Sequence, residues 1–180
     1  MVLRLKSNWL LGLCLLATGL GAQESAVTAH GVVNDATQRV MAVVVEADSY
    51  FDEDPERYYQ QVQDILDPVI DFRGFARSVM GPYASSSRYR SLDEAGRTQL
   101  RGQLDRFTEV MRRGLVRTYS KGLLAYGDSR VEVFAATDEN PEGDRATVRQ
   151  LVYNNQPEPY ILIYQMGRGK SGDCQLRNII

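Results

Sequence analysis

Histidine and cysteine are scarce in this chain of 180 residues. The single histidine, His30, excludes a metal site built from several histidines and disfavours a Ser-His-Asp arrangement. The two cysteines are Cys14 and Cys174, and Cys14 lies in an N-terminal apolar run. If that run is removed, no internal disulfide can form, and we expect Cys174 to be a buried apolar residue.

The chain also lacks an excess of positive charge and a hydrophobic run as long as a membrane span. The formal net charge of −2 argues against nucleic acid as the main partner, because neutralising phosphates requires a basic face. The apolar run from Trp9 to Leu20 is shorter than the ~20 residues of a spanning helix. Apolar content of 43% and charged content of 24% are ordinary globular values, and no internal repeat is visible. A single domain with its own core is therefore expected.

The N-terminus has the layout of a secretory signal peptide. Two basic residues precede the apolar run, and small residues follow it, in the stretch MVLRLKSNWLLGLCLLATGLGAQESA. We expect a signal peptide over residues 1–22 and a single domain over 23–180. Cleavage after Gly19 or Ala29 and a retained membrane anchor are the alternatives. Removing residues 1–22 leaves 19 basic and 23 acidic residues, a formal charge of −4.

The first part of the remaining chain is predicted to be helical. Apolar residues recur at helical spacing over 33–50, 55–69, 71–81 and 91–120. Asp54 followed by Pro55 is a helix start, and Asp71 can cap the third helix. Ser91, followed three residues later by Glu94, predicts a capping box for the longest helix.

The second part changes to the period of a strand. Val131, Val133 and Ala135 alternate, and further strands are predicted at 145–153, 159–166 and 174–180. The short connections predict an antiparallel meander. The expected fold class is therefore α+β, with N-terminal helices packed on a curved antiparallel four-stranded sheet that encloses an apolar cavity.

No residue pattern predicts catalysis. The turn GRGKSG is followed by a strand, whereas a phosphate-binding loop opens a helix. Acidic residues are frequent between Asp52 and Asp71, but they lie in caps, loops or off the apolar stripes. The arginines of the longest helix form a solvated face or meet an acidic partner or anionic head groups, and the sequence leaves these alternatives open.

The predicted third strand has apolar residues on both faces. Tyr160, Leu162 and Tyr164 alternate with Ile161 and Ile163. Ordinary core can explain this pattern, with a second face under a loop. The alternative is a cavity between sheet and helices that holds an apolar ligand. We expect the tyrosine face to line the cavity and the isoleucine face to pack as core.

Several segments, in order, resemble the MlaC family, also called the toluene-tolerance family. The stretch YFDEDPERYYQQVQDILDPVIDFRGFARSVMGPY is similar to its long helix followed by Leu-x-Pro-x-x-Asp-Phe and Gly-x-Tyr. FTEVMRRGLVRTYSKGLLAY and SGDCQLRNII resemble its later helix and strand, with Ser120 for an alanine and Cys174 for a tryptophan. The family continues beyond this last strand, so a missing C-terminal closing segment is expected, with Ile179 and Ile180 exposed or poorly paired.

The resemblance implies a periplasmic phospholipid carrier that needs no cofactor or metal and is not an enzyme. Such carriers shuttle lipid between an inner-membrane ABC transporter complex with an MCE-domain subunit and an outer-membrane lipoprotein–porin complex, which maintains the lipid asymmetry of the outer membrane. The residues alone leave two alternatives open, a small α+β enzyme and a periplasmic interaction module. The predicted lipid-binding residues are Phe72, Phe75, Val79, Leu104, Phe107, Met111, Leu115, Tyr119, Val133, Leu151, Tyr153, Tyr160, Leu162 and Tyr164.

Overall fold

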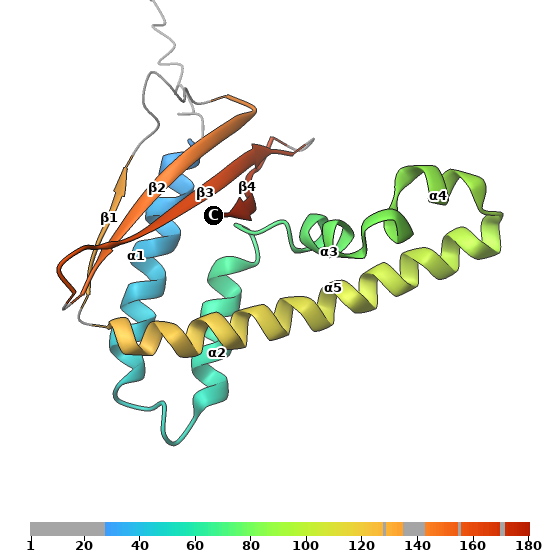
Figure 1. The fold of residues 1–180 in the computed structure, drawn as a ribbon. Coiled ribbons are helices and arrows are strands. Elements are labelled where there is room, and N and C mark those ends of the chain that lie inside the picture. The colour runs from blue at the N-terminus through green and yellow to red at the C-terminus, as the bar shows by residue number, and fades with distance from the viewer. Residues whose placement is uncertain (1–27, 128, 135–142, 155, 170–171) are drawn as a thin grey trace, which may run out of the picture.

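A computed structural model describes residues 28–127, 129–134, 143–154, 156–169 and 172–180. The predicted signal peptide, the predicted strand residue Ala135 and most of the following turn lie outside these ranges. The described chain folds into helices followed by strands (Figure 1). The helices are α1 (Ala29–Ala47), α2 (Pro55–Leu66), α3 (Phe72–Met80), α4 (Ser86–Ser91) and α5 (Glu94–Leu123), with short 3₁₀ turns η1 (Gly81–Ala84) and η2 (Leu124–Tyr126).

Helix starts follow the capping residues of the sequence, with one correction. The side chain of Asp54 accepts a hydrogen bond from the Arg57 amide, and Asp71 caps α3 in the same way. The prediction of Ser91 as the cap of the longest helix is wrong. Ser91 ends the separate short helix α4, and Asp93 caps α5 by accepting a hydrogen bond from the Gly96 amide. The separate short helix α4 precedes the longest helix and includes Ser91. The residue that begins the longest helix is therefore Asp93, which is also a good capping residue.

The strands form the predicted antiparallel meander. They are β1 (Arg130–Phe134), β2 (Arg145–Tyr153), β3 (Tyr160–Arg168) and β4 (Cys174–Ile179), in the order β1-β2-β3-β4. The register shifts between Gln165 and Met166, where β3 pairs with β4. On the other side of β4, the Leu176 amide donates to the Val69 carbonyl at 2.7 Å, which joins the segment between α2 and α3 to the sheet. The predicted α+β fold with a four-stranded antiparallel sheet is thus confirmed.

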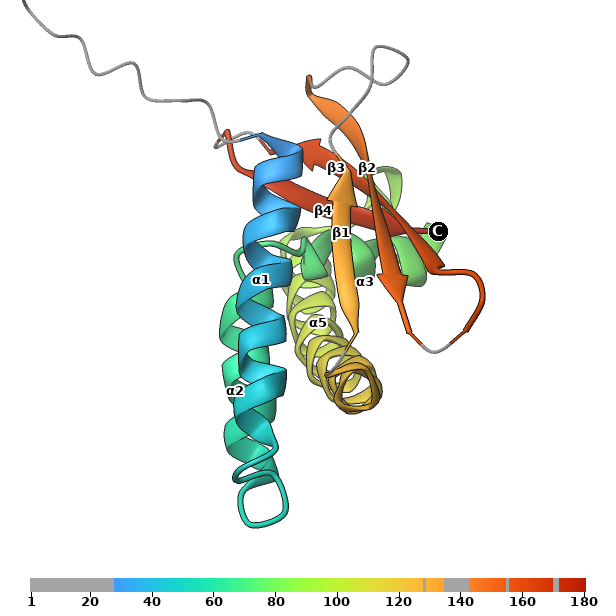
Figure 2. The same ribbon diagram turned by 90° about the vertical axis from the view of Figure 1, so that its left-hand side faces the viewer.

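The hydrophobic core is divided into two clusters. A helical cluster joins α1, α2 and α5 and contains Val44, Tyr58 and Val116 among its buried members. A sheet cluster joins the start of α1 to β2, β3 and β4, as Figure 2 shows for the upper half of α1. Ile70, between α2 and α3, packs against both clusters. Cys174 is buried in the sheet cluster, as expected.

The two faces of β3 have different surroundings. Tyr164 and Met166 lie opposite Val148 and Ala146 of β2, and this face packs on the start of α1. The alternate residue Ile161 is 56% exposed. The prediction that the isoleucine face packs as core is therefore wrong at Ile161, because the helices cover the sheet from the tyrosine side.

Ile179 and Ile180 are exposed, as predicted, but the backbone is paired. The Ile180 amide and carbonyl exchange hydrogen bonds of 2.9 and 3.0 Å with Ile163. The expectation that these residues are exposed or poorly paired is thus met by their exposure alone, since the ladder between β3 and β4 continues to them. The sheet is open, because β1 and β4 form its two edges.

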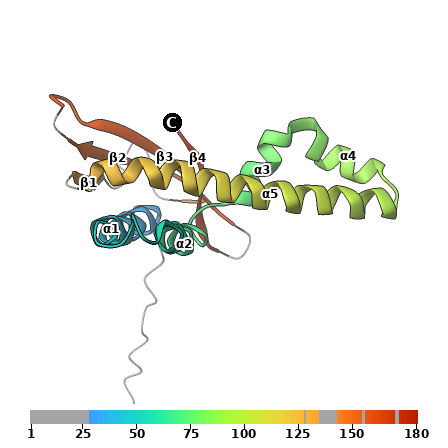
Figure 3. The same ribbon diagram turned by 90° about the horizontal axis from the view of Figure 1, so that it is seen from below.

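A helical arm extends away from the sheet. It consists of residues 72–106, which comprise α3, η1, α4 and the first part of α5. Figures 1 and 3 show α4 and the start of α5 at the end of the molecule remote from the strands. Leu100 and Leu104 of α5 are buried within the arm. The arm therefore presents a large surface that the sheet does not cover.

Candidate functional site

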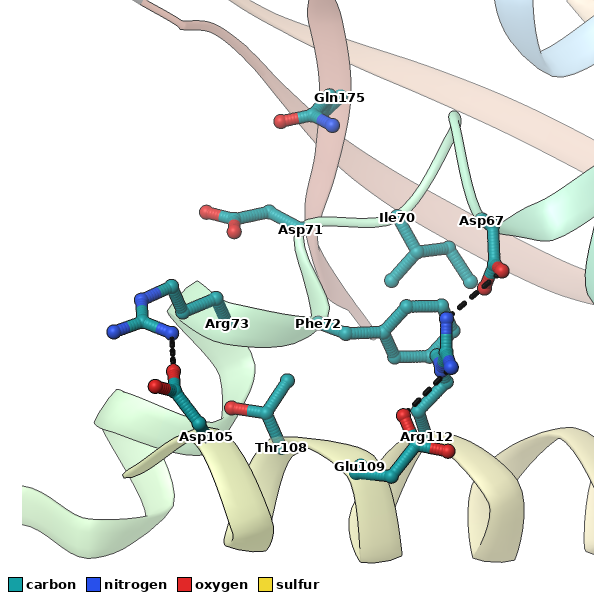
Figure 4. Close-up of a pocket in the computed structure, with 10 residues that line it drawn as sticks. All are labelled: Asp67, Ile70, Asp71, Phe72, Arg73, Asp105, Thr108, Glu109, Arg112 and Gln175. Carbon is teal, nitrogen blue, oxygen red and sulfur yellow. Dashed lines mark hydrogen bonds and ion pairs between the residues drawn. The ribbon is translucent and has the colours of Figure 1, made fainter. Parts of the chain in front are cut away.

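A pocket of about 320 Å³ lies where α2, α3, α5 and β4 meet (Figure 4). Ile70 and Phe72 form its apolar wall, and Thr108 lies opposite on α5. The remaining lining residues are polar or charged: Asp67, Asp71, Arg73, Asp105, Glu109, Arg112 and Gln175. This pocket is an open, mixed cleft and differs from the predicted enclosed apolar cavity.

Arg112 links the carboxylates of two elements at one side of the pocket. Its guanidinium donates to Asp67 Oδ2 at 2.9 Å and to Glu109 Oε2 at 2.6 Å. Burial raises the pKa of Asp67, and the neighbouring Arg112 charge acts in the opposite direction. Within the described chain, Asp67 Oδ1 and Arg112 Nε are buried without a hydrogen-bond partner. The cluster connects the end of α2 to α5 and is incompletely satisfied.

The other carboxylates of the pocket also have structural partners. Asp105 of α5 pairs with Arg73 of α3. Asp71 caps α3 and pairs with Arg177 of β4. Each acid is thus held by a cation or a backbone amide, which is the arrangement of ion pairs joining elements. Within the described ranges, no group of three or more His, Cys, Asp or Glu side chains is placed to hold a metal ion.

The predicted lipid-binding residues do not gather at one site. Phe107, Met111 and Leu115 are half-buried along α5. Leu162 and Tyr164 are half-buried on the helix-facing side of the sheet. Phe72 and Leu104 are buried, whereas Phe75 and Val133 pack against the sheet cluster. Val79, Tyr119 and Tyr160 are exposed, with 67%, 67% and 51% of their surfaces accessible.

Leu151 and Tyr153 lie on the outer face of the sheet. Leu151 is paired with Ile161, which points to the opposite side from Leu162. Tyr153 donates a hydrogen bond to Glu132 at 3.2 Å and carries the Arg130 guanidinium over its ring. The register therefore separates these two residues from Leu162 and Tyr164, and one cavity on the helix side cannot contain all four.

Sequence reasoning omitted several residues of the helix-facing side. Val131 and Val152 are paired across β1 and β2 and are half-buried on that side. The alternation of Val131 with Val133 was a sufficient signal for one of them. Gln150 was not predicted, although it is buried on the same side and accepts a hydrogen bond from Tyr164. Burial raises the pKa of Tyr164 to about 12.

Comparison with known proteins identifies the family. The family model described as MlaC protein matches residues 34–180, and the chain therefore belongs to the MlaC family. It is also similar to the toluene tolerance protein ttg2D of Pseudomonas putida, with 27% identity over 156 residues. That alignment covers 87% of this chain and 66% of the relative. No described helix combines the length and hydrophobicity of a membrane span.

Proposed function

We propose that this protein is a periplasmic phospholipid carrier. The observation that carries the proposal is its membership of the MlaC family over residues 34–180. In this role the protein takes lipid from one membrane complex and delivers it to another. Its partners are an inner-membrane ABC transporter complex with an MCE-domain subunit and an outer-membrane lipoprotein–porin complex. Phospholipid is the cargo, and the proposal assigns no catalytic residue, metal or cofactor.

The divided core supports a place for the acyl chains. The helical and sheet clusters are separate and share Ile70 at their border. Apolar side chains remain half-buried on α5, at Phe107 and Met111, and on the sheet, at Val152 and Leu162. We place the cargo between these two surfaces, on the helix-facing side of the sheet.

The energetics of a carrier depend on the reference state. Burial of ~28 methylenes at about 0.8 kcal/mol each favours the complex over lipid in water by ~20 kcal/mol before costs. This approaches the ceiling of non-covalent affinity. In a membrane, however, the acyl chains are already out of water, so the free energy of moving a lipid from the membrane to the protein lies near zero. Such a protein can both load and unload lipid, and the partner complexes set the direction.

Adjacent residues of β3 provide a matched test. Leu162 faces the helices and Ile161 faces outward. We expect native mass spectrometry to detect copurifying phospholipid in the wild-type protein and in I161Q, and much less in L162Q. Circular dichroism of both variants verifies that the fold is retained. Equal lipid content in both variants would place the cargo elsewhere, and a folded wild-type protein without lipid would contradict the carrier function.

A further inference from the structure

The helical arm has a charge opposite to that of the rest of the protein. Residues 72–106 contain seven arginines and three acidic residues, a formal charge of +4. The whole chain carries −2, so the remainder carries −6. Five of the seven arginines lie on α4 and the first part of α5, which Figure 3 shows at the end of the molecule remote from the strands, and the other two lie on α3.

Most arginines of the arm are not neutralised by carboxylates. Arg73 pairs with Asp105, and it is the one arginine of the arm with an acidic partner in the described chain. The side chains of Arg77 and Arg90 have no hydrogen-bond or ion-pair partner among the described residues, although the Arg90 carbonyl accepts a hydrogen bond from the Arg97 guanidinium at 3.1 Å. Elsewhere, carboxylates pair with arginines at positions 39, 57, 112, 113, 117, 130 and 177. The arm therefore has donor capacity that the fold leaves available.

Four arginines of the arm border one pocket, and one of the four, Arg73, is paired with Asp105. It has a volume of about 340 Å³ and is bounded by α3, α4 and α5. Its arginines are Arg73, Arg77, Arg90 and Arg101, and its hydroxyl groups come from Ser85, Ser86 and Tyr89. Its apolar lining comes from Ala84, Leu100 and Leu104, all of them buried. The pocket thus combines many hydrogen-bond donors with an apolar floor.

Two hydrogen bonds within the arm hold the Arg101 side chain in one orientation before any ligand binds. Its guanidinium donates to the Tyr89 hydroxyl at 3.0 Å and to Thr98 Oγ1 at 3.1 Å. Neither acceptor carries a charge, so the positive charge of Arg101 remains available to an anion. Fixing a guanidinium in advance reduces the entropy lost on binding.

We propose that this pocket binds the phosphate of an anionic phospholipid head group and docks the arm on a membrane surface. Guanidinium groups only donate hydrogen bonds, and a phosphodiester only accepts them. A peptide brings backbone N–H donors as well; the four arginines offer these no acceptor, and the three hydroxyl groups are the pocket's side-chain acceptors for them. The apolar floor suits the glycerol and first methylene groups that adjoin a lipid phosphate. The complementarity therefore favours a lipid surface over an acidic protein.

Vesicle cosedimentation tests the proposal. The purified protein is mixed with vesicles of phosphatidylglycerol and phosphatidylethanolamine, or of phosphatidylcholine alone. We expect binding to the anionic vesicles that weakens as salt is raised, because the Debye length falls from about 30 Å at 0.01 M to about 10 Å at 0.1 M. Little binding to phosphatidylcholine is expected. Absence of binding to anionic vesicles at low salt would overturn the proposal.

A charge-matched pair of variants locates the surface. Each basic residue near an anionic leaflet strengthens binding about fivefold, so R77Q/R90Q should weaken it about 25-fold. The control R39Q/R113Q removes the same charge from exposed helix positions whose ion pairs measure 3.5 Å. It should bind almost like the wild type. Equal weakening in both variants would show a general charge effect and refute docking through the arm.

Docking does not depend on the carrier function. The vesicle assay measures attachment, whereas copurifying lipid measures cargo. A protein that binds anionic vesicles through the arm but contains no lipid would retain the docking proposal and contradict the carrier. Circular dichroism of R77Q/R90Q confirms that a loss of binding is not a loss of fold.

Discussion

Replacing Tyr58 by phenylalanine tests how much one buried hydrogen bond between α2 and α5 stabilises the fold. The Tyr58 side chain is fully buried, and its hydroxyl donates to the Ser120 carbonyl at 2.8 Å. The ring packs edge-on against Phe51, with centroids 5.5 Å apart, and a phenylalanine ring keeps that contact. The substitution therefore removes one buried hydrogen bond and little else. We expect the unfolding free energy to fall by about 1 kcal/mol, which lowers the Tm by roughly 2–4 °C.

Tyr59 supplies the matched control for this measurement. Its ring is tilted against Tyr58 at 5.6 Å, but its hydroxyl has no hydrogen-bond partner among the described residues. Urea unfolding of the Tyr59→Phe variant should thus give a free energy within about 0.5 kcal/mol of the wild type. If both variants were equally stable, the bond to Ser120 would contribute nothing and the reasoning would fail.

Alkaline pH adds a second readout for Tyr58. Burial raises its pKa from 10.0 to about 12. Since the folded state favours the neutral phenol, its contribution to stability is complete below pH 10 and is lost as the pH rises through 12. The Tyr58→Phe variant lacks this loss. The stability difference between wild type and variant should therefore shrink above pH 10, and a constant difference would contradict the assigned shift.

Two further substitutions have defined outcomes. Arg112→Gln leaves the half-buried Asp67 without its cation and should cost about 1–2 kcal/mol, after allowance for the partial exposure of both side chains. Burial already raises the pKa of Asp67, so this loss of stability should be larger at pH 7, where the carboxylate is charged, than at a pH below the ordinary pKa of an aspartate. Adding Asp67→Asn to the Arg112→Gln variant should remove this pH dependence in urea titrations. Val148→Ala opens space in the fully buried centre of the sheet and should cost about 2 kcal/mol by thermal unfolding. Val45→Ala, at a 64% exposed position of α1, should be nearly neutral, and a similar cost at both sites would contradict the assigned core.

The helix and strand order could be read from the sequence because its signals are local. Asp54 with Pro55 and Asp71 mark helix starts by hydrogen bonds to residues three positions away. The alternation of Val131 and Val133 and the short connections likewise predict strands. The error at Ser91 has the same origin. Ser91 and Asp93 are both good caps, and only the presence of the separate helix α4 assigns the longer helix to Asp93.

The site was predicted less completely, because alternation does not say which face of a strand is covered. The sequence grouped Leu151 and Leu162 in one cavity, whereas the register places them on opposite faces. That register depends on pairing between strands, and a shift of one residue reverses every side chain. The prediction that Ile161 and Ile163 of β3 pack as core was wrong at Ile161 for the same reason.

By itself, the sequence determined an α+β domain with helices before strands and arginines along its longest helix. Only the tertiary structure decided the two separate core clusters, with Ile70 between them, and the pocket of arginines on the arm. It also joined Arg112 to Asp67, which lies 45 positions earlier in the chain. The physical reason is range: capping and periodicity act over a few residues, whereas ion pairs, sheet faces and pockets require segments distant in the chain to meet.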